Sequence, residues 1–209
     1  MTEKRSKPRV RPRTFDREVA LRTVMDVFWQ YGYEGTSISK LLEATGLKAT
    51  SLYAAFGDKE SLFKEAVKLY IEIEGAYVWG DYSQELSTKE LLKGVLKRAA
   101  KTLCHKDISR GCLLLIGDKG LNPENSHIKD FLSTVRDNLR SDLSAKIYQG
   151  IENGDLPGNT NVAASVSMIM IFLSGISLEV LDHGDEEALI VIQQAIDGFM
   201  QFWPVVSAG

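Results

Sequence analysis

The sequence has few of the residues that hold small folds together by covalent bonds or metal ions. Its 209 residues include only two cysteines and five prolines. Neither cysteine lies in a CxxC pair, which argues against a disulfide scaffold and a structural zinc site, so we expect reduced thiols in a cytoplasmic protein. Hydrophobic residues make up 44% and charged residues 25%, the composition of an ordinary globular chain.

Motifs of common enzyme classes are also missing. The sequence has no GxSxG, P-loop, GxGxxG or HExxH pattern, so we expect neither an enzyme nor a bound cofactor. Cys104, His105, Cys112 and His127 are the soft metal ligands nearest to one another, but their spacing is poor for a preorganised site and no metal is predicted. A redox-sensing thiol at either cysteine stays open as an alternative to an inert one.

Long apolar runs are scarce. The charged segment 1–20 has no apolar run behind it, which argues against a secretory signal. Residues 161–178 form an 18-residue stretch without charge, but serines interrupt it and Glu179 closes it. Because a bilayer span needs about 20 predominantly apolar residues, we expect a buried helix and no membrane association.

Charge is distributed unevenly, although the net charge is only −3. Residues 1–69 hold 13 Lys or Arg against 9 Asp or Glu, whereas residues 70–209 hold 12 against 19. Residues 1–22 hold eight basic and three acidic side chains. This basic arm, which contains Pro8 and Pro12, is typical of a tail that binds phosphate groups, and the alternative is a solvated leader without a partner.

Four helices are expected in the first 79 residues. Apolar residues at helical spacing predict them over 16–31, 38–45, 48–56 and 58–79. Gly32, Gly46 and Gly57 end the first three helices, and Thr36 and Ser37 are candidate caps of the second. The second and third helices are too short to be stable without their longer neighbours.

Two short helices joined by a tight turn and braced by longer ones are the parts of a helix-turn-helix. The third helix is expected to bury Leu52 and Phe56 and to leave Lys48, Thr50 and Ser51 pointing outward. Side chains on such a face can enter a DNA major groove. A helical hairpin without a nucleic-acid partner is the alternative that the pattern leaves open.

Three stretches in this region read FWQYGYEGTSI from Phe28, ATGL from Ala44 and SLYAAFGDKESLF from Ser51. Together they resemble the DNA-binding domain of the TetR family of bacterial transcriptional regulators. The resemblance implies an all-α homodimer whose N-terminal three-helix domain, residues 14–74, binds a palindromic operator through a helix-turn-helix at about 37–56. Residues 1–13 are then a basic arm, and residues 75–209 a helical ligand-binding and dimerisation domain.

The resemblance also implies roles for individual side chains. Residues expected to face bases are Lys48, Ala49 and Thr50 at the start of the third helix, with Tyr53 and Ala55 further along. Residues expected to contact phosphates are Thr36 or Ser37, Ser51, Tyr53 and Lys59. Lys48 can donate a hydrogen bond to guanine, and Thr50 can contact a thymine methyl or a base edge. The alanines of this helix are small and apolar, so few direct hydrogen bonds to bases are expected. The alternative for Thr36 and Ser37 is capping alone.

The charge of the arm gives a further expectation, which does not depend on the resemblance. Arg9, Arg11 and Arg13 lie ahead of the first helix, from where they are expected to reach a neighbouring minor groove. A narrow A·T-rich tract concentrates negative potential there.

The remainder of the chain is expected to stay helical. Apolar residues at helical spacing predict helices over 88–103, 126–152, 161–181 and 186–202. The last two carry more apolar surface than one small layer covers, so burial against a second copy is expected. The resemblance agrees and places a homodimer interface at about 160–182 and 185–203.

The resemblance further implies a small-molecule effector that moves the fourth helix and changes the spacing of two DNA-reading heads. A repressor released by its effector is the expected outcome, with an activator left open. Candidate pocket aromatics are Tyr77, Trp79, Tyr82, Phe131, Tyr148, Phe172 and Trp203, and plain core packing is the alternative for each. A helical ligand-binding, metal-sensing or redox-sensing protein without sequence-specific DNA binding is the second functional class.

Overall fold

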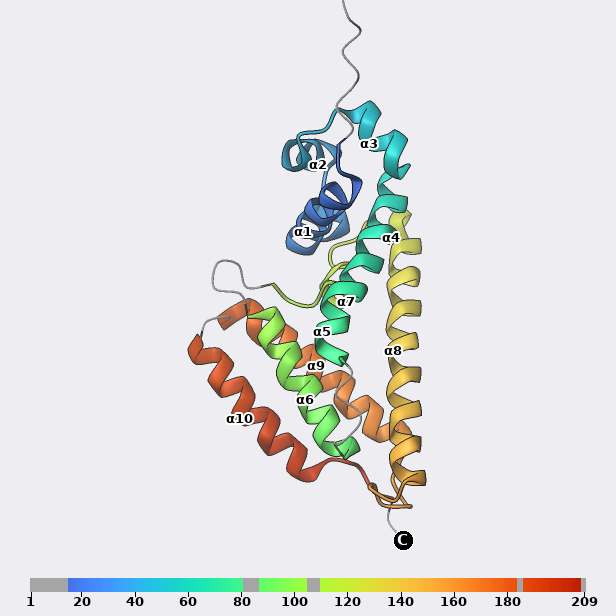
Figure 1. Ribbon diagram of the computed structural model, residues 1–209, viewed down its shortest axis with the longest axis vertical. Coiled ribbons are helices and arrows are strands. Elements are labelled where there is room, and N and C mark those ends of the chain that lie inside the picture. Colours follow the sequence, from blue (N-terminus) through green and yellow to red (C-terminus); the bar gives the residue numbers. More distant parts are fainter. Residues whose placement is uncertain (1–14, 81–86, 105–109, 184–185, 208–209) are drawn as a thin grey trace, which may run out of the picture.

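The computed structural model describes residues 15–80, 87–104, 110–183 and 186–207. The helices, in chain order, are α1 (Arg17–Gly35), α2 (Ile38–Thr45), α3 (Ala49–Phe56), α4 (Lys59–Tyr70), α5 (Ala76–Trp79), α6 (Thr88–Leu103), α7 (Leu113–Ile116), α8 (Ser126–Glu152), α9 (Val162–His183) and α10 (Glu186–Phe202). Helices α1–α3 lie at one end of an elongated molecule and α6, α9 and α10 at the other, with α4 running between them (Figure 1). The described residues form no strand beyond an isolated bridge between Thr160 and Val206, as the predicted all-α class requires.

The helix-turn-helix is built by its caps. Asp16 caps α1 and Ser37 caps α2, and each side chain accepts backbone N–H groups of the following turn. Gly46 ends α2 with a φ of 66°, in the left-handed region that glycine adopts without a steric penalty. Gly57 and Asp58 then separate α3 from α4. The predicted helix-turn-helix is therefore present, with its boundaries within a residue or two of those expected.

Gly32 interrupts α1 instead of ending it. Its φ of 67° and ψ of −179° break the helix, and one further turn follows to Gly35. Beyond the break, the Tyr33 backbone N–H donates to the carbonyl oxygen of Gly117 at 3.1 Å. The sequence predicted a helix end at Gly32, and the difference arises because the extra turn packs against α7.

The helical path that begins with α4 continues in one direction across the predicted domain boundary between residues 74 and 75. After Tyr70, a π-helical turn spans Ile71–Gly75 and leads into α5. The predicted helix over residues 58–79 is thus one rod made of three segments. Because a π turn contains an extra residue, the hydrogen-bond ladder changes register where the rod leaves the N-terminal half.

Aromatic side chains pack the two halves into one core. Tyr33 of α1 meets the edge of the Phe63 ring of α4 at a centroid distance of 5.2 Å, and Phe63 meets Phe131 of α8 at 6.5 Å. Trp29 of α1 meets the edge of Tyr70 at 4.9 Å. Edge-to-face pairs of this kind add to the large apolar area that aromatic rings bury. The N-terminal domain is therefore held against the C-terminal helices by side-chain packing as well as by the chain connection.

The C-terminal helices follow their predicted ranges closely. Helices α6, α8 and α10 match them, and α9 ends two residues later than expected. Ser87 and Glu90 begin α6 with reciprocal side-chain hydrogen bonds, a capping box. The short α7 was not predicted, because a segment of four residues is too short to show helical periodicity, and a 3-10 turn lies at Pro123–Asn125.

Helix α9 has the length and composition of a membrane span, with a mean hydropathy of 1.9 over an 18-residue window, 39% of which is buried. It packs against α6, α8 and α10. Ile169, Ile176 and Val180 are buried on that side, whereas Ile171 and Leu178 are exposed on the other. The helix thus has one apolar face in the core and a second one outside it.

Candidate nucleic-acid interface and internal cavity

Helix α3 turns one side to the core and the other to solvent. Leu52 and Phe56 are only 1% and 3% exposed, as predicted from their spacing. Lys48, Thr50 and Tyr53 are exposed. Lys48 precedes the first turn of α3 and its side chain makes no cap hydrogen bond there. Lys48 at the N-cap, and Thr50 and Tyr53 within the helix, therefore expose an ammonium, a hydroxyl and a phenol to solvent.

The other residues predicted to contact DNA occupy different settings. Ala49 and Ser51 are half-buried at the start of α3. Lys59, the first residue of α4, places its Nζ 4.2 Å from the centre of the Tyr33 ring. Desolvation by this partial burial lowers the pKa of Lys59. Its ammonium is engaged within the domain, which makes it a weaker candidate for a phosphate contact than Lys48.

Thr36 and Ser37 separate clearly in the structure. Ser37 is exposed, accepts the Lys40 backbone N–H at 3.2 Å and lies 2.8 Å from the hydroxyl of Ser39. Thr36 is fully buried, and its Oγ1 donates to the Gly32 carbonyl oxygen at 2.7 Å. A hydroxyl committed in this way cannot meet a phosphate. Of the two alternatives that the sequence left open, only Ser37 lies at the surface.

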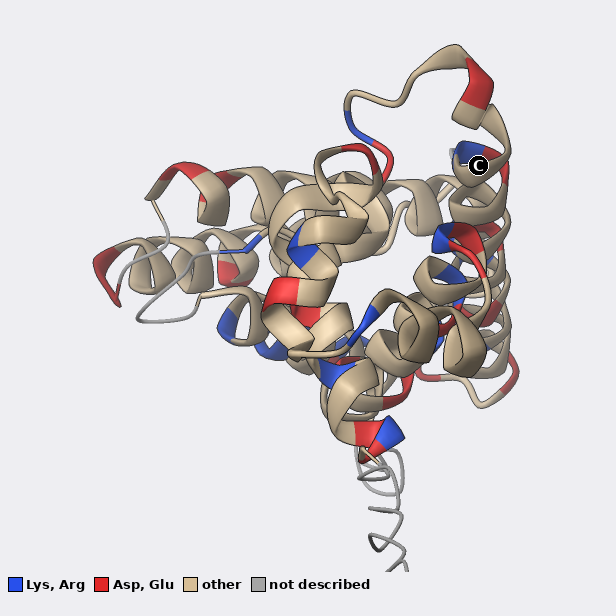
Figure 2. Cartoon of the chain, turned by 90° about the horizontal axis from the view of Figure 1, so that it is seen from above, with Lys and Arg blue, Asp and Glu red and all other residues tan. Residues whose placement is uncertain are grey.

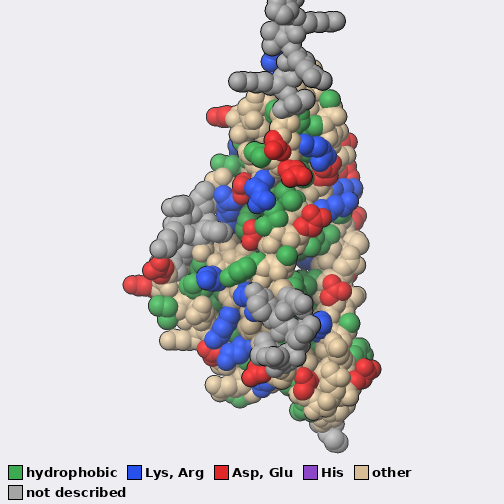
Figure 3. Space-filling model, in the orientation of Figure 1, with side chains coloured by type: hydrophobic (Ala, Val, Ile, Leu, Met, Phe, Trp, Pro, Cys, Tyr) green, Lys and Arg blue, Asp and Glu red, His purple; other side chains and the backbone are tan. Residues whose placement is uncertain are grey.

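The positive charge of the N-terminal region is concentrated ahead of its helices. Residues 15–69 hold seven basic and eight acidic side chains, whereas residues 1–13 hold six basic and one acidic. Side chains of both signs are intermixed over the described chain (Figures 2 and 3). The predicted minor-groove residues Arg9, Arg11 and Arg13 lie outside the described residues. Most of the net positive charge of this region therefore belongs to the arm.

A cavity of about 720 Å³ lies between the fourth helix and the C-terminal helices. Most of its lining is apolar, with contributions from α4 to α9 such as Val78, Val95, Leu115, Leu139 and Met170. Its volume is within the range of small-molecule sites, which are mainly apolar with a few polar groups. The structure thus contains the pocket expected in the C-terminal domain, although its lining could not be identified from sequence.

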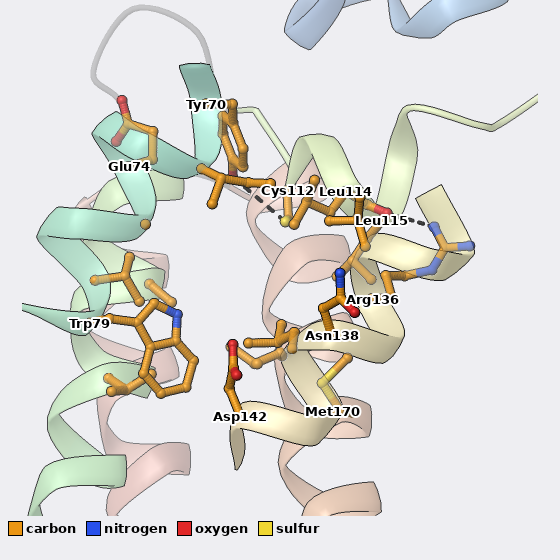
Figure 4. Close-up of a pocket in the computed structure, with 18 of the residues that line it drawn as sticks. Tyr70, Glu74, Trp79, Cys112, Leu114, Leu115, Arg136, Asn138, Asp142 and Met170 are labelled. Carbon is orange, nitrogen blue, oxygen red and sulfur yellow. Dashed lines mark hydrogen bonds between the residues drawn. The ribbon is translucent and has the colours of Figure 1, made fainter. Parts of the chain in front are cut away.

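A few polar side chains line this cavity, and they lie apart from one another. The Trp79 indole and the Asp142 carboxylate lie across from each other (Figure 4). Arg136 also lines the cavity, but its guanidinium donates to the Leu114 carbonyl oxygen at 2.6 Å and pairs with Asp118 at 3.2 Å. The charge of Arg136 is therefore used to hold the protein together. Apolar contact dominates what the cavity offers a ligand.

Of the aromatic candidates, Trp79 alone is among the lining residues of this cavity. Phe172 stacks on Phe199 and Trp203 is buried, whereas Tyr77 and Tyr148 are exposed. Phe131 packs on Phe63, as described above, and Tyr82 lies outside the described residues. The remaining lining residues were missed because the cavity forms between helices, where single-helix periodicity carries no signal.

No group of three or more His, Cys, Asp or Glu side chains could hold a metal ion among the residues that the structure describes. His105 lies outside them. Cys104 and Cys112 are not joined in a disulfide.

Comparison with known proteins decides the family. Residues 20–66 match the family described as bacterial regulatory proteins, tetR family. The HTH-type transcriptional repressor ComR of Escherichia coli K12 is 30% identical over 199 residues, covering 95% of this chain and 93% of that protein. The chain belongs to the TetR family.

Further similarity extends to a complex with DNA. The HTH-type transcriptional repressor BdcR of the same strain is 31% identical over 124 residues, covering 59% of this chain and 63% of that protein. A cysteine mutant of the TetR-family regulator CifR, solved with a 26-base-pair operator duplex, matches with a TM-score of 0.85 and 33% identity. That match covers 93% of this chain and 100% of the CifR chain. In this TetR-family regulator, α2 and α3 form the helix-turn-helix.

Proposed function

We propose that this TetR-family regulator is a repressor that binds a palindromic operator as a homodimer and releases it when a small molecule occupies the cavity. The observation that carries the proposal is the exposure of Lys48, Thr50 and Tyr53 at α3, where the Lys48 side chain makes no cap hydrogen bond. A helix of this size enters a major groove, where base edges are distinguishable. The repressor names of ComR and BdcR favour repression over activation.

Recognition is divided between α3 and its surroundings. Lys48 donates to guanine O6 or N7, and Thr50 meets a thymine methyl or a base edge. Tyr53, Ser51 and Ser37 contact phosphates and fix the register of the helix. Because only Lys48 brings a charged donor to α3, shape readout by the arm supplies part of the specificity.

A homodimer interface forms through α9 and α10. Large apolar side chains exposed on these helices are Ile171, Leu178, Leu181, Ile190, Val191 and Phe202. A second copy that covers this surface places two α3 helices on one side of the DNA, and the two-fold axis of the dimer explains a palindromic operator. The protein acts in the cytoplasm, where its DNA lies.

The effector is a largely apolar small molecule, as the cavity lining indicates. Its binding favours a form of the dimer in which the two α3 helices no longer fit successive major grooves. A ligand can shift this equilibrium only by its difference in affinity for the two forms.

Selection from random duplexes tests the proposal. Purified protein is mixed with a random-sequence duplex library at physiological salt, and bound duplexes are amplified and sequenced over several rounds. We expect a palindrome whose half-sites are about one helical turn apart. Enrichment of no sequence, with full recovery of folded protein, would show a helical protein without operator specificity. Lys48→Ala serves as the matched variant, because it removes a predicted base contact from the exposed side of α3.

A further inference from the structure

Residues 110–117, here called the wall segment, are bound to α1 by side-chain contacts at their start. The Trp29 Nε1–H donates to the Gly111 carbonyl oxygen at 2.6 Å. Arg110 pairs with Asp26 at 2.7 Å, and its guanidinium lies 5.3 Å from the centre of the Trp29 ring. Trp29 is only 3% exposed, so this hydrogen bond is protected from water. The start of the wall segment is thus fixed to the first helix of the DNA-binding domain.

The end of the wall segment is bound to α1 through the backbone. The Tyr33 N–H, just after the break in α1, donates to the Gly117 carbonyl oxygen at 3.1 Å. A Cβ at residue 117 would lie 2.6 Å from the Leu113 carbonyl oxygen and 3.4 Å from the Phe63 ring. Since a real Cβ does not approach so closely, the tight packing there requires glycine. Both ends of the segment therefore contact α1 with little free space.

The middle of the same segment forms part of the cavity lining. Cys112, Leu114 and Leu115 line the cavity. The Cys112 Sγ accepts a hydrogen bond from the Tyr70 hydroxyl, and the Leu114 carbonyl oxygen accepts one from Arg136 (Figure 4). A molecule in the cavity thus touches residues whose immediate chain neighbours hold α1.

The wall segment also contacts α9, the helix with the exposed apolar face. The Cys112 N–H donates to the Ser177 hydroxyl oxygen at 2.8 Å. A Cβ at residue 111 would lie 2.8 Å from that hydroxyl oxygen and 2.9 Å from Leu181 Cδ1. The segment is therefore confined between α1 on one side and α9 on the other, so it cannot move without changing its contacts with α1.

We infer that the wall segment, held to α1 by Trp29 and Arg110, couples cavity occupancy to the orientation of the DNA-binding domain. Trp29 and Arg110 are positioning residues, because neither of them lines the cavity or belongs to α3. An occupant that displaces Cys112 and Leu115 breaks the contacts of Gly111 and Gly117 with α1. The first helix then shifts relative to α9, in addition to any movement of α4. This inference rests on the proposed function and adds a second route to it.

Packed interfaces respond to displacement by switching between discrete arrangements, because their interiors leave no room for gradual deformation. Coupling between two sites is also reciprocal. If an occupant that displaces the wall segment lowers the affinity for DNA, operator binding must oppose that displacement by the same free energy. The state of the wall can therefore be measured without knowing the effector.

Cys112 is a built-in reporter of the wall, since the chain has only two cysteines. In a Cys104→Ser background, N-ethylmaleimide labels Cys112 alone, and its rate is measured by mass spectrometry with and without saturating selected operator. We expect operator to slow labelling by about 5-fold or more, the lower end of typical allosteric coupling. Adding Trp29→Phe, which removes the N–H donor but keeps a ring, is expected to reduce this protection below about 2-fold.

Matched variants keep the test decisive. Arg110→Gln cuts the second contact to α1 without disturbing a buried ring, and it is expected to act in the same direction if Trp29→Phe fails to fold. Arg140→Gln is the control, because it removes an exposed cation of α8 that pairs with Asp137 at 3.7 Å. It should leave the protection unchanged.

Three results would count against the inference. Tight operator binding with no change in the labelling rate of Cys112 would show that the wall does not sense DNA. Full protection in both the Trp29 and the Arg110 variants would assign the coupling to α4 alone. Failure of any duplex to bind would overturn the proposed function itself, and is seen separately in the affinity measurement.

Discussion

Tyr70 and Cys112, which are 42 positions apart in sequence, meet at the cavity wall, where the tyrosine hydroxyl lies 3.6 Å from the cysteine Sγ. Burial raises the pKa of the Cys112 thiol, and it raises the pKa of Tyr70 well above its ordinary value. Both groups are therefore neutral at physiological pH. A neutral buried thiol is a poor nucleophile, so this end of the cavity offers a ligand weak hydrogen bonding and no reactive thiolate.

The raised pKa of Cys112 predicts a loss of stability at alkaline pH. Because the folded state favours the protonated thiol, the stabilisation is complete below the unfolded pKa, near 9.0, and is lost as pH rises from there through the folded pKa. Cys112→Ser keeps a hydrogen-bonding group that does not titrate. We expect its free energy of unfolding to fall less steeply, by up to about 1.4 kcal/mol per pH unit above pH 9.

Urea unfolding at pH 7.5, 9 and 10 measures this difference. Cys104→Ser is the matched control, since it also removes a thiol. Parallel pH profiles for the wild type and Cys112→Ser would show that Cys112 does not titrate differently in the folded and unfolded states.

Removing the ammonium of Lys48 is expected to weaken operator binding. A good contact to a base edge is worth about 1–3 kcal/mol, so Lys48→Ala should lose that much affinity for the selected operator and tolerate base changes at one position of each half-site. Fluorescence anisotropy with a panel of singly substituted duplexes measures both effects. Lys129→Ala is the control, because Lys129 is exposed on α8, outside the DNA-binding domain. Equal losses on every duplex would instead indicate a phosphate contact.

Deleting residues 1–13 is expected to flatten the salt dependence of binding. The rest of the DNA-binding domain is close to neutral, so the arm carries most of the charge that displaces counterions from DNA. If Arg9, Arg11 and Arg13 each neutralise one phosphate, the slope of log K against log salt should fall by roughly 2.7. Binding titrations between about 50 and 200 mM salt measure this slope. An unchanged slope would remove the arm from the interface.

The apolar surface of α9 and α10 predicts a specific weakness of the dimer. Val191 is 60% exposed within one chain. Val191→Asp should weaken dimerisation by about 2 kcal/mol or more, because the partner would have to bury an unpaired carboxylate. Sedimentation velocity at micromolar concentration should show monomers that keep their helical content. Tyr148→Asp, at a site 56% exposed on α8, is the control and should stay dimeric. Dimers in both variants would place the interface elsewhere.

Local structure could be predicted where one helix decides it. The spacing of Leu52 and Phe56 fixed which side of α3 is buried, and Ser37 was identified as a cap from its residue type. Thr36 was treated as equivalent to Ser37, and only the tertiary structure shows that its hydroxyl is buried against Gly32. Periodicity describes one helix at a time and does not report which neighbour covers a residue.

The wall segment shows where sequence reasoning fails. Residues 110–117 contain only one turn of helix, and their contacts to Trp29, Tyr33 and Ser177 lie far away along the chain. The glycines at 111 and 117 are explained by close approach of other elements, which no local pattern reports. The cavity lining has the same origin, because the π turn and the helices from α4 to α9 all contribute to it.

The central claim is that two copies of the chain present α3 to a defined DNA sequence. The most direct measurement is competition between the selected operator and a scrambled duplex of the same composition at physiological salt, with the protein-to-DNA ratio of the complex determined by light scattering. We predict two protomers per operator and a preference of about 1,000-fold or more over the scrambled duplex. Equal affinity for the two duplexes, or a complex with one protomer, would contradict it.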